Sequence, residues 1–132
     1  MAAIVATVFG SLAALVHLYI FVLESVRWTR PRTWQIFGIA DQAAADTIRP
    51  MAFNQGFYNL FLAIGAAVGL ALLWIGAPGT VADVAGRTLA LFTLASMVAA
   101  SLVLLTGGTR YLRPALLQGA APLIGFVFLL FA

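Results

Sequence analysis

The chain has 132 residues, of which 64% are hydrophobic and 8% charged. A soluble domain is about 45–50% apolar and about 25% charged, and a globule of this size has too little interior to hide so much apolar surface from water. The composition therefore excludes a soluble enzyme and a disordered regulator. The absence of cysteine excludes a disulfide scaffold. We expect the surrounding solvent to be lipid.

Four apolar segments follow one another, at about residues 3–26, 51–75, 88–105 and 115–132. A hydrocarbon core of about 30 Å is crossed by roughly 17–25 helical residues, and the backbone inside lipid must satisfy its own hydrogen bonds. The first segment has no positively charged start and is longer than a signal-peptide core, so we expect it to be retained. The pattern predicts an all-α fold, a four-helix transmembrane bundle that forms one integral membrane domain over residues 1–132.

The net charge of +3 comes from seven arginines and four acids. Six of the arginines lie in the first and third connections, residues 27–50 and 106–114, which four spans place on the same side of the membrane. The positive-inside rule assigns that side to the cytoplasm, so both termini are expected to face outward. No basic face with aromatic platforms accompanies the arginines, and we expect no nucleic-acid partner.

The first connection differs from the others in length and content. It carries Trp28 and Trp34 between its arginines, and both are expected in the headgroup layer. Residues 36–48, with their regular acid spacing, are expected to form either a short interfacial helix or an ordered connector.

A few polar residues lie within the apolar segments. His17 and Glu24 are seven residues apart, nearly two helical turns, and so share a face. Gln55 and Asn59 share a face at a spacing of four, as do Asn54 and Tyr58. The ligand-binding candidates are His17, Glu24, Asn54, Gln55, Tyr58, Asn59 and Gln118.

These residues all fall in the half of the membrane near the arginine-rich connections, at a rise of about 1.5 Å per residue. If their faces converge, they line a pocket that opens to the cytoplasm. Each has a plainer interpretation. Glu24 can be an interfacial acid neutralised by Arg27, His17 a core histidine bonded to Tyr58 or Asn59, and the amides a means of holding helices together.

Two further patterns bear on partners. Gly65 and Gly69 form a small-xxx-small pattern, which serves either packing within the bundle or a homo-oligomer. One histidine and no cysteine cannot supply the usual zinc ligands, and no phosphate-loop or dinucleotide motif occurs. We therefore expect no metal and no cofactor, and a partner set of the lipid bilayer, a small molecule and a second copy.

Several strings resemble a known family, the small bacterial membrane proteins catalogued as domain of unknown function 1304. They are Ala14-Leu15-Val16-His17-Leu18-Tyr19-Ile20, Leu23-Glu24, Trp28-Thr29-Arg30-Pro31, Phe37-Gly38, Asn54-Gln55-Gly56-Phe57-Tyr58-Asn59 and Gln118-Gly119. The resemblance covers nearly the whole chain and implies a multi-pass protein of the bacterial cytoplasmic (inner) membrane. It implies no activity. An acid often precedes the histidine in this pattern, whereas this chain has Val16, which argues against an adjacent histidine–carboxylate pair.

Three functions remain open from the sequence. The first is the binding or translocation of a small solute, and it is favoured because ionisable groups within spans are costly and usually functional. The second is a structural or accessory subunit in which the polar residues only hold helices together. The third is a membrane-embedded acid–base enzyme of the isomerase type, in which His17 and Glu24 move protons on a lipophilic substrate.

Overall fold

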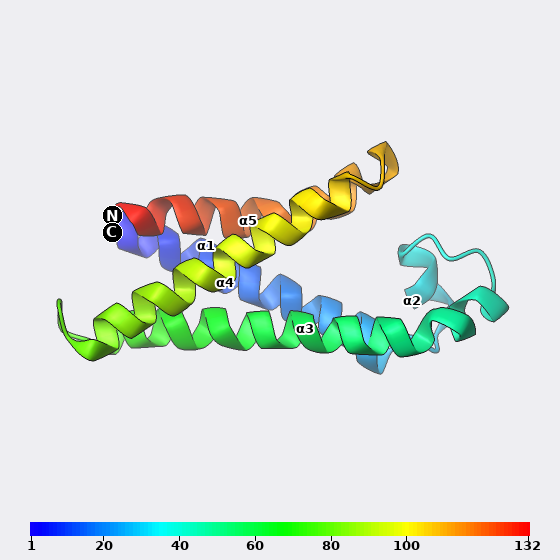
Figure 1. Cartoon of the computed structure of the whole chain (residues 1–132), viewed down its shortest axis with the longest axis horizontal. Coiled ribbons are helices and arrows are strands. Elements are labelled where there is room, and N and C mark those ends of the chain that lie inside the picture. The colour runs from blue at the N-terminus through cyan, green and yellow to red at the C-terminus, as the bar shows by residue number, and fades with distance from the viewer. The chain divides into compact units, whose positions relative to one another are not determined.

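A computed structural model describes all 132 residues, which form helices and no strand (Figure 1). The elements are α1 (Ala2–Phe21), a π-helical turn η1 (Val22–Val26), α2 (Pro31–Ile36), α3 (Gln42–Ile75), α4 (Val81–Leu105), a 3₁₀ turn η2 (Thr109–Tyr111) and α5 (Leu112–Leu130). The predicted all-α class is confirmed.

Four helical segments are long and apolar enough to cross a membrane: Ala2–Val26, Gln42–Ile75, Val81–Leu105 and Thr109–Leu130. Each contains most or all of one predicted apolar segment. The chain is therefore a multi-pass membrane protein with four membrane-capable helices.

Helix α3 begins at Gln42, well before the apolar segment it contains. The Asp41 carboxylate accepts a hydrogen bond of 2.8 Å from the backbone N–H of Ala44, which satisfies one of the orphan donors at the helix start. Pro50 lies inside the helix, where it cannot donate to the carbonyl of Asp46. Residues 42–48, expected as an interfacial helix or a connector, are thus the first turns of α3.

The chain folds into two compact units. The four-helix unit comprises Met1–Val16 and Leu62–Ala132, and the smaller unit comprises His17–Phe61. The core of the four-helix unit takes buried residues from all four long helices: Ala6, Ala13, Ala66, Leu70, Ala90, Leu94, Met97, Ala121 and Leu129. Alanine dominates this core, so the helix backbones approach closely.

Gly65 and Gly69 pack against α4 within the four-helix unit. A Cβ atom on Gly69 would lie 2.6 Å from the backbone nitrogen of Ala90, and one on Gly65 would lie 2.5 Å from Cγ2 of Thr93. These distances are too short for any side chain larger than hydrogen. The small-residue pattern therefore serves packing inside the chain, and a homo-oligomer through Gly65 and Gly69 stays a prediction.

Two side chains, those of Trp74 and Arg87, form hydrogen bonds between segments of the same unit. Trp74 Nε1 donates to Thr7 Oγ1 at 2.8 Å, which links α3 to α1. Arg87, the one arginine outside the two arginine-rich connections, donates from Nη1 to the carbonyl of Leu129 at 2.9 Å and from Nη2 to that of Ala132 at 3.0 Å. It thereby binds the C-terminal end of α5, where carbonyls lack helical partners.

The smaller unit has its own aromatic core. Trp28, Trp34, Ala45 and Ala52 are buried in it. Trp28 Nε1 donates to the carbonyl of Ala45 at 2.9 Å, which ties the first connection to the start of α3. Both tryptophans pack within the protein, and their position in the headgroup layer stays a prediction.

Candidate functional site

Glu24 lies in the π-helical turn that ends the first membrane-capable helix. The backbone N–H of Arg27 donates to the carbonyl of Val22 at 2.9 Å, five residues earlier, where an α-helix would reach back four. Single π turns inside helices are rare and are frequently found at functional sites. The local backbone therefore marks Glu24 independently of its charge.

The π turn is held against α3 by Ser25 and Gly56. Ser25 Oγ donates to the backbone carbonyl of Phe53 at 2.8 Å. A Cβ atom on Gly56 would overlap Ser25 Oγ and would lie 3.1 Å from Cβ of Glu24. Only glycine at this position lets α3 approach the turn so closely.

Across this contact, Asn59 binds the Glu24 carboxylate. Asn59 Nδ2 donates to Glu24 Oε2 at 3.0 Å and to the backbone carbonyl of Gln55 at 3.1 Å. Both side chains are buried, with 5% of Glu24 and 8% of Asn59 exposed. The pair is a desolvated carboxylate fixed by a neutral amide.

The hydrogen bonds of the pair leave two acceptor atoms for other partners. The two N–H groups of Asn59 donate within the chain, so its Oδ1 and the second carboxylate oxygen of Glu24, Oε1, are the groups that remain. The site therefore offers two hydrogen-bond acceptors, Glu24 Oε1 and Asn59 Oδ1.

Arg27 does not neutralise Glu24. The Arg27 side chain is exposed, whereas Glu24 is buried and takes its hydrogen bond from Asn59. In the structure, the hydrogen-bond partner of the Glu24 carboxylate is Asn59 and not Arg27.

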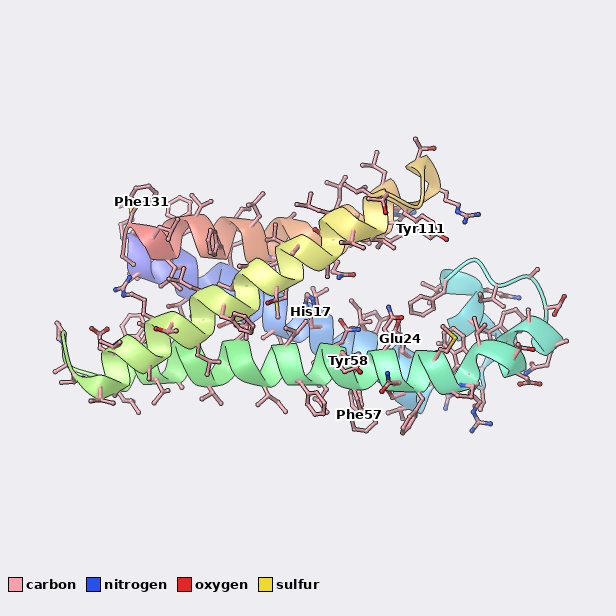
Figure 2. The ribbon with its side chains drawn as sticks, in the orientation of Figure 1. His17, Glu24, Phe57, Tyr58, Tyr111 and Phe131 are labelled. Carbon is pink, nitrogen blue, oxygen red and sulfur yellow. The ribbon has the colours of Figure 1, made fainter.

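The other candidate residues are placed differently. His17 is fully buried on α1, and Figure 2 shows it and Glu24 in order along that helix, with Tyr58 on α3. Asn54 and Gln55 are exposed, and Tyr58 is 59% exposed. Gln118 is half-buried on α5, in the four-helix unit. Among the candidates, a hydrogen bond between side chains joins Glu24 and Asn59, and the Asn59 side chain also binds the backbone carbonyl of Gln55.

Two residues of the site did not stand out from the sequence. Ser25 follows Glu24 directly, and Gly56 lies inside the amide-rich string. A glycine among large residues in a membrane helix indicates close backbone approach, which is the signal that identifies Gly56. Nothing in the sequence singles out Ser25.

Residues 11–130 match the family described as protein of unknown function (DUF1304). The match covers most of the chain, which therefore belongs to this family, as the sequence resemblance predicted. No curated protein and no solved structure matches the chain.

Proposed function

We propose that this member of the DUF1304 family binds a small solute carrying a protonated amine at Glu24 and Asn59, as the binding step of its passage across the membrane. The observation that supports the proposal is a buried carboxylate, within a π turn, whose hydrogen-bond partner is a neutral amide. The solute reaches the pair from the cytoplasmic side.

The charge of the site favours a cationic ligand. An acid within a membrane span is expensive unless it pairs with a charge of opposite sign or faces a wet cavity. Asn59 supplies a hydrogen bond but no charge, and the nearest arginine in sequence, Arg27, is exposed. A bound cation would complete the pair.

The hydrogen-bonding groups of the site favour the same chemistry. Glu24 Oε1 and Asn59 Oδ1 both accept, so the ligand must donate. A protonated amine has up to three N–H donors and a compact charge. Hydrogen bonds between an ammonium and a carboxylate are about twice as strong as those between neutral groups.

Saturable binding and uptake of radiolabelled methylammonium by the full chain in liposomes test the proposal. The variant Glu24→Gln keeps the size of the side chain and an oxygen that can accept from Asn59, but it removes the charge. We expect at least a tenfold weaker affinity for methylammonium, because a hydrogen bond to a charged group contributes about 1.5–3 kcal/mol.

The matched control is Asp46→Asn, which removes one negative charge from an exposed side chain of α3. It should bind methylammonium as the native chain does. The proposal is wrong if the native chain shows no saturable methylammonium binding, or if Glu24→Gln binds it as well as Asp46→Asn does.

A further inference from the structure

The start of α5 carries a shallow groove with a volume of about 480 Å³. Two of the residues that line it are arginines, one is a threonine and three are leucines: Thr109, Arg110, Leu112, Arg113, Leu116 and Leu117. The groove lies in the four-helix unit, whereas Glu24 and Asn59 belong to the smaller unit.

The basic end of the groove has no acid to neutralise it. The connection from Thr106 to Pro114 and the whole of α5 contain no aspartate or glutamate, and both Arg110 and Arg113 are exposed. These two side chains form a local excess of positive charge, which favours an anionic ligand.

Arg110 is held in place by the aromatic ring beside it. Its guanidinium carbon lies 4.7 Å from the centroid of the Tyr111 ring, within cation–π range. The ring in turn packs on Gly107, where an added Cβ would lie 2.7 Å from Tyr111 Cε2. A cation–π contact uses the face of the ring and leaves guanidinium N–H groups that can donate to an anion.

The other end of the groove is apolar and exposed. Leu116 is 59% and Leu117 65% exposed. Leu117 lies one helical turn beyond Arg113 on the same face, about 6 Å along the axis. The groove therefore has positive charge at one end and apolar side chains one helical turn farther along. This order complements an anionic lipid, in which a negatively charged phosphate is followed by acyl chains.

We propose that this groove binds an anionic glycerophospholipid. Arg110 and Arg113 bind its phosphate, and Leu116 and Leu117 contact the first carbons of an acyl chain. Arginine suits a phosphate because its planar guanidinium donates two parallel hydrogen bonds. The apolar part of the groove favours a lipid over a free phosphate ion, which has nothing to place there.

Native mass spectrometry of the full chain, titrated with dioleoyl phosphatidylglycerol, measures the affinity. We expect the double variant Arg110→Gln with Arg113→Gln to bind this lipid about 25-fold more weakly, since each basic residue near a lipid surface contributes about fivefold. Dioleoyl phosphatidylcholine, whose headgroup has no net charge, should bind the native chain as weakly as phosphatidylglycerol binds the variant.

The control variant is Arg30→Gln with Arg32→Gln, which removes two exposed arginines from the other arginine-rich connection. It should retain phosphatidylglycerol binding. The proposal is overturned if the Arg110/Arg113 variant binds within twofold of the native chain, or if the control loses as much. It is also overturned if glycerol phosphate, which has no acyl chain, displaces the lipid at equal concentration.

Discussion

The hydrogen bond between Asn59 and Glu24 depends on Gly56, a residue that takes no part in it. The donor and the acceptor belong to different elements, α3 and η1, and they meet because the backbone of Gly56 lies against Ser25 and Glu24. A close approach of backbones is thus what desolvates the carboxylate. The packing of α3 against the π turn at Gly56 therefore also sets the geometry of the Glu24–Asn59 pair.

We expect Gly56→Ala to destabilise the protein by about 1–3 kcal/mol, the usual cost of forcing atoms into a packed position. It should also weaken methylammonium binding, because α3 must move away from Glu24. Chemical unfolding in detergent measures the first effect. Ala67→Val, which adds volume at an exposed position of α3, should change stability by no more than about 0.5 kcal/mol; equal losses for both variants would contradict the packing argument.

The sequence identified Glu24 and Asn59 as candidates but grouped them with residues that lie elsewhere. A spacing of four predicts that Gln55 and Asn59 share a face, yet Gln55 is exposed and Asn59 is buried. Periodicity shows which residues are neighbours, not which face a helix turns toward its own chain. In a helix that is apolar on all sides, no polar face marks the direction of the interior.

Among the elements, α5 shows how the end of a helix is stabilised by a residue that is remote from it in the sequence. Arg87 lies near the start of α4, and its guanidinium binds the carbonyl of Leu129 in the last turn of α5 and that of Ala132 just beyond the helix. A cation at a helix C-terminus interacts favourably with the helix dipole as well as with the unpaired carbonyls. The sequence analysis set Arg87 apart from the other six arginines, but it did not predict that this side chain binds another helix.

We expect Arg87→Leu to destabilise the last turn of α5, since it removes two charge-assisted hydrogen bonds. Hydrogen–deuterium exchange of residues 126–130 should become faster, and the free energy of unfolding should fall by about 1–2 kcal/mol. Arg49→Leu removes the same charge from an exposed position and should leave exchange in α5 unchanged. Unaltered exchange in Arg87→Leu would mean that these hydrogen bonds do not hold the helix end.

Helix boundaries were predicted less well than helix number. A hydropathy pattern detects only the part of a helix that must be apolar because it lies in lipid. Helix α3 begins earlier, at Gln42, and its first residues include the charged Asp46 and Arg49. The cause is local: Asp41 caps the helix, and Ala45 and Ala52 are buried in the aromatic core of the smaller unit. Such packing is not visible in hydropathy.

For the whole molecule, the four apolar segments of the sequence predicted four membrane-capable helices, and the structure confirms them. It did not predict two compact units, with α1 and α3 each contributing to both. Their boundary falls within helices rather than at a linker, so no change of composition marks it.

The orientation of the chain in the membrane is a testable prediction. The chain has no cysteine, so single exposed cysteines report on the side they face. We expect Thr29→Cys and Thr109→Cys to react with a membrane-impermeant maleimide only after the cells are opened, and Pro78→Cys to react in intact cells. The reverse pattern would place both termini in the cytoplasm.

The π turn at Val22–Val26 also has a consequence for homologues whose first helix is one residue shorter. Such a turn accommodates one residue more than an α turn, and each α-helical residue rotates the chain by about 100° around the axis. A homologue that lacks one residue between His17 and Trp28 would form an uninterrupted helix with the same phase at both ends. Only its acidic side chain would point in another direction. Counting residues across this interval should therefore separate homologues that retain the carboxylate–amide pair from those that have lost it, even where every flanking string is identical.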